Sequence, residues 1–269
     1  MLGEIIFNSA VLRGPLFFCL FVLMFFTSAA AEVNGHWRPI ENIEGCNFWD
    51  TLFVSGQPAM ATGSCLNGHI HGDGVVTVRD VAGQGRYEGR FENGKLQGKG
   101  VFEGLIMRQG KLRKVRYEGE FVDSVFQGHG VLIGGDEFEY TGEFMHGVFN
   151  GHGKLNVKNE LIYSGDFVDG ELAGRGTMVV NGGVKYRYEG EFLGRSKHGH
   201  GVQEFSDGSR YEGEYRNGSR EGHGIATFPS GNACEGEWLK GMLVGVGVGT
   251  VSDRSVKCAN DGGEIKFFE

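Results

Sequence analysis

The chain has 269 residues, with 34 acidic and 26 basic side chains and a formal net charge of -8 at pH 7. This acidic balance argues against a nucleic-acid partner, which would require a basic stripe. Glycine contributes 49 residues and phenylalanine 21, without the period of three that marks collagen. The composition therefore predicts a chain with a packed core, and 40% hydrophobic residues are enough to build one.

Residues 1–31 have the layout of a secretory signal peptide. Arg13 precedes an apolar run from Leu16 to Phe26, and three alanines end the segment at Ala31. The run is shorter than the ~20 apolar residues that a membrane-spanning helix needs. We expect cleavage after Ala30 or Ala31 and a periplasmic or secreted mature protein. The alternative is an uncleaved membrane anchor formed by residues 16–31.

Residues 32–60 lack any repeat but are rich in aromatic side chains. Trp37, Phe48, Trp49 and Phe53 stand there among turn-forming residues. A repeat array needs end segments that cover its first and last units. We interpret residues 32–60 as an N-terminal cap whose aromatic side chains cover the open face of the first unit.

Residues 61–250 repeat one pattern eight times. The pattern contains, in this order, an aromatic residue, Gly-Glu, a second aromatic residue, a glycine and Gly-x-Gly. The clearest copy runs from Tyr211 to Gly224. Self-similarity at a fixed period predicts structural units that bury their apolar faces only against their neighbours. The first glycine of each unit is Gly63, Gly89, Gly119, Gly142, Gly165, Gly190, Gly213 and Gly236.

Alternation inside each unit indicates β-strands. Tyr211, Gly213 and Tyr215 fall on one face of a strand, and Glu212 and Glu214 fall on the other. A second alternating run follows, so each unit is predicted to be a β-hairpin. The mid-strand glycine should let an aromatic ring of the adjacent unit lie against bare backbone. The predicted fold is all-β, an elongated single-sheet β-hairpin solenoid of about eight repeats.

The motif Tyr-x-Gly-x-Phe-x-x-Gly-x-x-x-Gly-x-Gly resembles the MORN (membrane occupation and recognition nexus) repeat. Its best copies are residues 87–100, 163–176 and 211–224. The resemblance implies a membrane-associated or protein-interaction module, which in some relatives is joined to an enzyme. Residues 251–269 are too few for a catalytic domain and are interpreted as a C-terminal cap, so no enzyme and no cofactor are expected. Departures from the motif are Ser124 and Arg195 at the middle glycine, Cys234 at the leading tyrosine, and a first unit without aromatics.

Four histidines occupy the centre of the Gly-x-Gly element. Equivalent side chains two strands apart are ~9–10 Å from one another, too far to share one metal ion. We expect them to pair with the acidic residues of the outward face, and a metal site is the alternative. Through the series this position holds Asp73, Lys99, His129, His152, Arg175, His200, His223 and Val246.

A basic cluster coincides with the longest spacing between units. An extended hairpin tip with these cations could contact an anionic membrane surface, at about 1 kcal/mol per well-placed charge. A solvated tip without a ligand is the plain alternative. The candidate contacts for lipid or another anion are Arg108, Lys111, Arg113, Lys114 and Arg116.

Four cysteines follow the predicted signal, an even number that fits an oxidising compartment. Pairing within each end, Cys46 with Cys65 and Cys234 with Cys258, would close short loops. Regular geometry places Cys258 two strands from Cys234, beyond the ~7 Å that a disulfide tolerates. Four separate thiols are the alternative, and no spacing typical of a zinc site is present.

These features predict a non-enzymatic, extracytoplasmic repeat scaffold that binds a protein partner or a cell-surface component. The alternative is a peripheral protein that binds anionic membrane lipid through residues 105–116. An enzyme with an unrecognised site along the aromatic face is a third hypothesis. Sequence alone does not name the partner.

Overall fold

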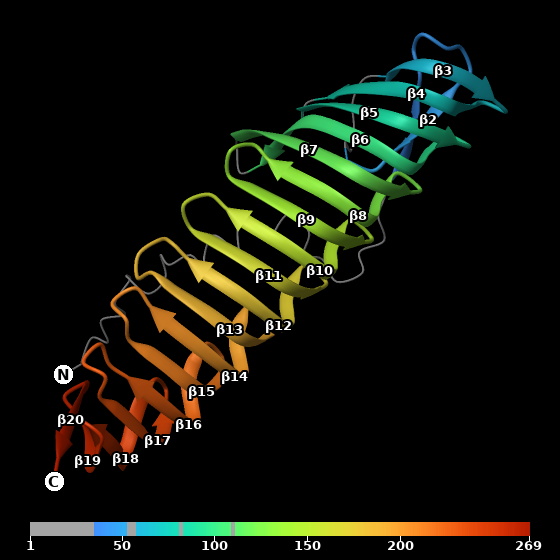
Figure 1. Cartoon of the computed structure of the whole chain (residues 1–269). Helices are drawn as coiled ribbons and strands as arrows, with labels where there is room; N and C mark the ends of the chain where they lie inside the picture. Colours follow the sequence, from blue (N-terminus) through green and yellow to red (C-terminus); the bar gives the residue numbers. More distant parts are fainter. Residues whose placement is uncertain (1–34, 53–57, 81–82, 109–110) are drawn as a thin grey trace, which may run out of the picture. The chain divides into compact units, whose positions relative to one another are not determined.

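The computed structural model describes residues 35–52, 58–80, 83–108 and 111–269. Within these ranges the chain forms twenty β-strands and no helix, which confirms the all-β class (Figure 1). In the same ranges no segment is an apolar helix long enough to cross a membrane. The predicted signal peptide and Phe53 lie outside the described residues.

The strands fall into two compact units, which are described separately. The first is built on β1 to β10 and the second on β11 to β20. The strands of the first unit are β1 (His36–Pro39), β2 (Asn47–Asp50), β3 (Met60–Leu66), β4 (His69–Asp80), β5 (Gly83–Glu92), β6 (Lys95–Arg108), β7 (Lys111–Val122), β8 (Val125–Gly134), β9 (Phe138–Met145) and β10 (Val148–Val157). Those of the second are β11 (Leu161–Val168), β12 (Glu171–Val180), β13 (Tyr186–Leu193), β14 (Ser196–Phe205), β15 (Arg210–Arg216), β16 (Ser219–Thr227), β17 (Ala233–Leu239), β18 (Met242–Val251), β19 (Arg254–Asp261) and β20 (Glu264–Phe268).

Each strand pairs antiparallel with the next one along the chain. This holds from β3 to β10 in the first unit and from β12 to β20 in the second. Short β1 and β2 form their own hairpin, which meets β4 through Asn47 and His69. The predicted β-hairpin repeat is therefore confirmed, and the degenerate unit at residues 61–74 also folds as a hairpin.

A β-bulge recurs inside the hairpins. The pairing register shifts directly after the first glycine of a unit, for example after Gly119 and Gly190. The partner strand bends there at the first glycine of Gly-x-Gly, where φ is +57° at Gly128 and +52° at Gly199. L-residues rarely adopt this left-handed conformation, so these positions require glycine.

The core is a ladder of tyrosine rings on one face of the strands. Tyr163 shows the pattern: its ring is fully buried, and its hydroxyl donates to the carbonyl of Asp166 at 3.0 Å. The ring covers two glycines of its own hairpin, because a Cβ atom at Gly165 or Gly176 would lie 2.5 or 2.6 Å from the hydroxyl oxygen. Equivalent fully buried tyrosines are Tyr117, Tyr140, Tyr188 and Tyr211, whereas Tyr87 is also fully buried but donates its hydrogen bond to Asp50.

This arrangement corrects one sequence prediction. The ring over the glycine pair belongs to the same unit and not to the adjacent one. The neighbouring unit contributes Phe192, which stands edge-on to Tyr163 with centroids 5.1 Å apart and planes at 87°. The tyrosine is therefore held between the backbone of its own hairpin and a ring of the next, because the side chain folds back across its own strand.

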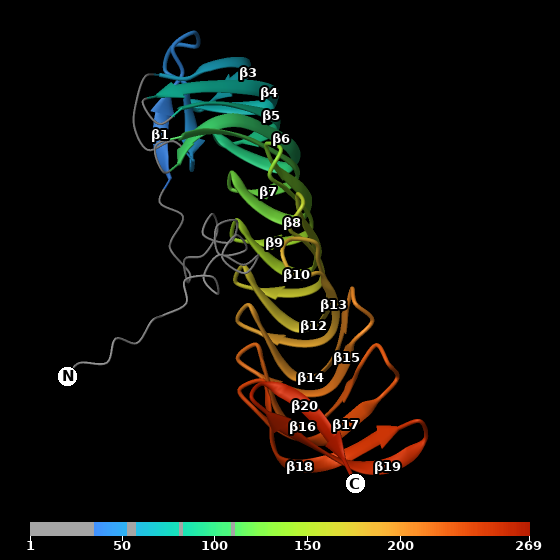
Figure 2. The same ribbon diagram turned by 90° about the vertical axis from the view of Figure 1, so that its left-hand side faces the viewer.

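The β1–β2 hairpin covers the ladder near its N-terminal end. Phe48 packs on Tyr87 with centroids 5.0 Å apart and on Phe91 at 6.0 Å. Arg38 and Asp50 form a buried ion pair at 2.8 Å, and Tyr87 donates a hydrogen bond to Asp50 at 3.0 Å. Figure 2 shows the strands of this unit curving around the side on which β1 lies.

At the other end, β19 and β20 continue the hairpin pattern across residues 251–269. Phe267 of β20 stands edge-on to Phe228, with centroids 5.8 Å apart. A Cβ atom at Gly249 would lie 2.9 Å from the ring of Phe267, so the bare glycine lets this ring close over β18. The expected closing strands are thus present and bury apolar surface of the last units.

Candidate binding surfaces

Acidic residues of the outward face accept hydrogen bonds from the backbone at the β-bulges. Glu143, Glu191 and Glu214 each accept a hydrogen bond at 3.4 Å from the backbone N–H at the centre of a Gly-x-Gly element. A Cβ atom at Gly199 would lie 3.0 Å or less from both carboxylate oxygens of Glu191. The acid that follows the first glycine of a unit therefore has a structural role.

The histidine row lies where the sequence predicts it, opposite acids of the next unit. The register places His129 opposite Glu143 and His200 opposite Glu214. His223 lies between two carboxylates, at 3.0 Å from Glu235 and 3.4 Å from Glu237. Within the ranges that the structure describes, no three His, Cys, Asp or Glu side chains gather closely enough to hold a metal ion.

Burial shifts the pKa values of the ladder tyrosines. Burial raises the pKa of Tyr117, Tyr140, Tyr163 and Tyr188 well above the usual range, and it raises the pKa of Tyr211 to about 12. The hydroxyls donate to backbone carbonyls, as Tyr140 does to Glu143 at 2.9 Å. These groups stay protonated near neutral pH, so their arrangement serves packing.

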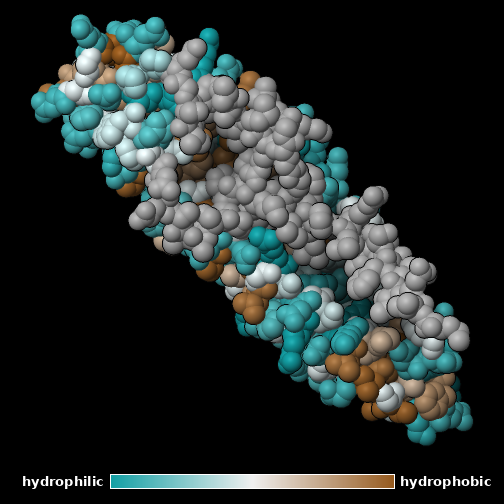
Figure 3. Space-filling model, turned by 180° about the vertical axis from the view of Figure 1, so that it is seen from behind, coloured by the Kyte–Doolittle hydropathy of each residue, from teal (hydrophilic) through white to brown (hydrophobic). Residues whose placement is uncertain are grey.

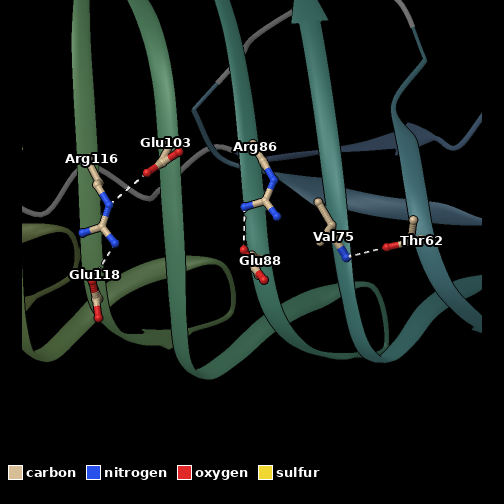
Figure 4. Close-up of polar contacts among 7 residues, drawn as sticks. All are labelled: Thr62, Val75, Arg86, Glu88, Glu103, Arg116 and Glu118. Atoms are coloured by element: carbon tan, nitrogen blue, oxygen red, sulfur yellow. Dashed lines mark hydrogen bonds and ion pairs between the residues drawn. The ribbon is translucent and has the colours of Figure 1, made fainter.

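The predicted basic cluster is divided by strand alternation. Lys114 and Arg116 share the outward face of β7, whereas Arg113 lies on the face of Val115 and the ladder and forms an ion pair with Glu137. Arg116 bonds Glu103 at 2.9 Å and Glu118 at 2.6 Å (Figure 4). Arg108 and Lys111 are backbone partners at the end of the β6–β7 hairpin, and their side chains lie outside the described part.

The outward face of β4 to β7 is hollowed beside Lys114. The hollow has a volume of about 420 Å³, and its charged lining residues are Arg79, Arg86, Lys114 and one acid, Glu103. Pairing across four strands brings them together, because Arg79 lies opposite Gln84, Gln84 opposite Leu105, and Leu105 opposite Lys114. Sequence analysis missed Arg79 and Arg86, since only the strand register joins them to residues 105–116.

Both cysteine pairs form disulfides in the structure. The Cα atoms of Cys46 and Cys65 are 5.9 Å apart, and those of Cys234 and Cys258 are 6.0 Å apart. Cys234 and Cys258 do lie two strands apart, on β17 and β19, but the prediction that this separation is too large for a disulfide was wrong. Between them β18 presents Gly249 opposite Cys234 and Gly247 opposite Cys258, so no side chain stands in the way and the sheet bends sharply there.

Two cations lie on the ladder face of the second unit, which sequence analysis also missed. Lys197 of β14 and Arg220 of β16 occupy the second position after the hairpin turn. The corresponding residues elsewhere are buried and apolar, so the cations interrupt a regular pattern. These residues are Ile70, Leu96, Phe126, Phe149, Leu172 and Leu243.

An apolar row lies on the outward face of β18. Val244, Val246 and Val248 are 51%, 63% and 59% exposed. Val246 takes the central position of Gly-x-Gly, where the preceding unit carries the polar His223. The last repeat therefore presents valine where the two preceding repeats present histidine.

Comparison with protein-family models identifies the repeats. The model described as MORN repeat matches residues 87–104, 117–137, 140–155, 163–184, 188–210, 211–233 and 234–248, about half of the chain. The first predicted unit, residues 61–74, is not matched. No curated protein matches the chain. MORN repeats are generally non-enzymatic modules that bind proteins or membranes. Seven matches in consecutive hairpins show that the chain belongs to the MORN-repeat family.

Proposed function

We propose that this chain is a non-enzymatic, extracytoplasmic scaffold that binds a protein partner through the outward face of its last repeat. The valine row of β18 carries the proposal. Exposure of grouped apolar side chains to water is unfavourable, so such a group on an exposed sheet face marks an interaction site. Val244, Val246 and Val248 extend from one strand with the same orientation, so a partner surface can cover all three at once.

The remaining outward residues supply a regular polar frame around this row. Glu235 and Glu237 lie on β17 beside it and are engaged with His223. Protein interfaces combine an apolar centre with a polar rim. The ladder face supports a structural role for the tyrosines, because their hydroxyls are bound to backbone carbonyls.

An extracytoplasmic location is supported by two independent features. The layout of residues 1–31 is that of a secretory signal, and two disulfides connect Cys46 to Cys65 and Cys234 to Cys258. Disulfides persist in oxidising compartments and are rare in reducing ones. Terminal sequencing of the native protein should find Ala31 or Glu32 as the first residue, and an intact Met1 would contradict the proposed location.

The binding proposal is tested with charge placed on the valine row. The full chain and its Val246→Glu variant are expressed in the native host, crosslinked and purified, and the bound proteins are quantified. We expect Val246→Glu to lose a partner that the parent retains, because a carboxylate would be desolvated at the centre of the interface. Val184→Glu is the matched control, since Val184 is 70% exposed in a turn away from β18. Equal losses in both variants, or none in either, contradict the proposal.

A second candidate function is favoured by the basic hollow beside Lys114. Arg79, Arg86 and Lys114 surround a volume of about 420 Å³ that an anionic lipid head group could enter. Co-sedimentation with phosphatidylserine vesicles tests it: binding should fall in Lys114→Gln and stay unchanged in Lys154→Gln, which removes an exposed outward cation of β10. Absence of vesicle binding by the parent chain contradicts the lipid hypothesis and leaves the protein-binding proposal standing.

A further inference from the structure

Lys197 and Arg220 lie among aromatic rings on the ladder face of the second unit. The ammonium of Lys197 is 4.8 Å from the ring centre of Tyr186 and 5.1 Å from that of Tyr215. The guanidinium carbon of Arg220 is 4.5 Å from the ring centre of Tyr211 and 5.4 Å from that of Trp238. Cation–π contacts of this kind orient both positive groups.

Neither cation has a carboxylate partner. The ion pairs of this unit engage other residues, such as Arg195 with Glu171 and Arg210 with Glu212, and within the described residues none includes Lys197 or Arg220. Lys197 donates to the side-chain oxygen of Gln203 at 2.8 Å, a neutral acceptor. Two like charges are thus placed close together without a neutralising group.

This placement of two cations is unfavourable without a nearby anion. Burial, and then the charge of Arg220, lower the pKa of Lys197 to about 8. A half-buried charge without a partner costs free energy that leucine at the same position, as in Leu172 and Leu243, does not. The backbone at both positions is held in place, because the carbonyls of Lys197 and Arg220 accept hydrogen bonds from the N–H groups of Gly218 at 2.9 Å and of Gly241 at 3.0 Å.

A cavity of about 410 Å³ adjoins Arg220 on the side of β20. Polar and apolar groups share its lining about equally, and the carboxylate among the lining residues, Glu264, bonds Lys266 at 2.5 Å. Figure 3 views the side toward which the strands curve and shows apolar surface at the C-terminal end of the chain. At the ~30 Å³ that a water molecule occupies in the liquid, the volume corresponds to roughly a dozen non-hydrogen atoms. Its lining includes Ala226, Phe228, Trp238, Leu243 and Ile265.

We infer that Lys197 and Arg220 bind the head group of a small organic anion whose apolar body enters the adjoining cavity. A carboxylate or a phosphate monoester would supply the missing negative charge, and Arg220 can bind either through two parallel N–H donors. The apolar lining would take up an alkyl or aromatic body of about ten carbons. The ladder face of the second unit thus contains a ligand site in addition to its packing role.

Isothermal titration of the purified mature chain with decanoate, decyl phosphate and uncharged decanol tests the inference. We expect at least one of the two anions to bind saturably and decanol to bind at least tenfold more weakly than that anion. The anion that binds more tightly identifies the head group. Arg220→Leu restores the residue type of Leu172 and Leu243, so it should fold at least as stably as the parent and bind the preferred anion at least tenfold more weakly. Lys197→Leu should likewise fold at least as stably as the parent and bind the preferred anion at least tenfold more weakly.

The matched control is Arg216→Gln, which removes an exposed cation of β15 that pairs with Glu221 at 3.6 Å. It should bind the preferred anion as the parent does. The inference is overturned if neither anion binds the parent saturably, or if Arg220→Leu, with an unchanged melting temperature, binds as tightly as the parent. The assay contains no protein partner, so its outcome is independent of the proposed scaffold function.

Discussion

Gly165→Val tests the ladder at the point where a tyrosine ring covers bare backbone. A Cβ atom at Gly165 would lie 2.5 Å from the Tyr163 hydroxyl oxygen, 2.7 Å from the carbonyl oxygen of Arg175 and 2.7 Å from the Cα atom of Gly176. Separations this short require the tyrosine ring or the neighbouring strand to move. Valine adds two further methyl groups to the same space.

Two effects lower the free energy of unfolding of this variant. Overpacking of a buried position costs typically 1–3 kcal/mol. Displacement of the Tyr163 hydroxyl breaks its 3.0 Å bond to the carbonyl of Asp166, which contributes about 1 kcal/mol. We therefore expect Gly165→Val to lower the free energy of unfolding by about 2–4 kcal/mol. For a chain of this length each kcal/mol shifts the melting temperature by roughly 2–4 °C.

The assay is thermal unfolding followed by circular dichroism, with Ser164→Val as the control. Ser164 is exposed on the opposite face of the same strand, so valine there meets solvent and suits the strand conformation. Gly165→Val should melt at least roughly 5 °C below Ser164→Val. Equal melting temperatures would refute the packing of Tyr163 over the glycine pair.

Three further outcomes are expected. Phe48→Ala should destabilise the chain by about 3–5 kcal/mol in urea unfolding, since the ring is fully buried against Tyr87; a loss below about 1 kcal/mol would show that the β1–β2 hairpin does not seal the ladder. Hydrogen bonds that the His223 ring donates to Glu235 and then to Glu237 raise the pKa of His223, so its contribution to stability is complete below about pH 6.5 and is lost as pH rises through the folded pKa. Titration by NMR should show a lower pKa for His223 in Glu235→Gln, and an unchanged value would contradict the pairing. Because the pKa of Lys197 is lowered, the unfolded chain binds more protons than the folded chain between about pH 8 and 10.5, and the parent should gain stability relative to Lys197→Leu as pH rises across that window. Parallel curves of unfolding free energy against pH for the two proteins would contradict the burial of Lys197. The groups that face Lys197 are Tyr186, Tyr188, Gln203, Tyr215 and Arg220.

Much of the architecture could be predicted because inward-facing and outward-facing residues alternate along each repeat. Tyr211 and Tyr215 fall on one face of a strand by the period of two, and the structure buries both. The bulges could not be placed in the same way. Extra residues between Arg220 and Gly224 of β16, opposite the single residue between Gly213 and Tyr215, shift the register, and the sequence contains glycines at several positions that could absorb the shift.

The candidate sites were harder to predict because they depend on which strands pair. Arg79 lies 35 positions before Lys114, and only the register of β4 to β7 places both at one hollow. Lys197 and Arg220 occupy a position that is apolar in the other units, and because charged side chains usually face solvent, their inward orientation was not expected. The link from Cys234 to Cys258 depends on a bend at β18 that regular strand spacing does not suggest.

Site-specific photo-crosslinking at Val246 tests the scaffold proposal most directly. A photoreactive phenylalanine analogue is placed at Val246 in the native host, and the same analogue is placed at Arg175, the corresponding exposed position of another repeat, as the control. We predict a discrete crosslinked protein from position 246 that is absent from position 175. No adduct at position 246, or the same adducts at both positions, would contradict a partner-binding face on the last repeat.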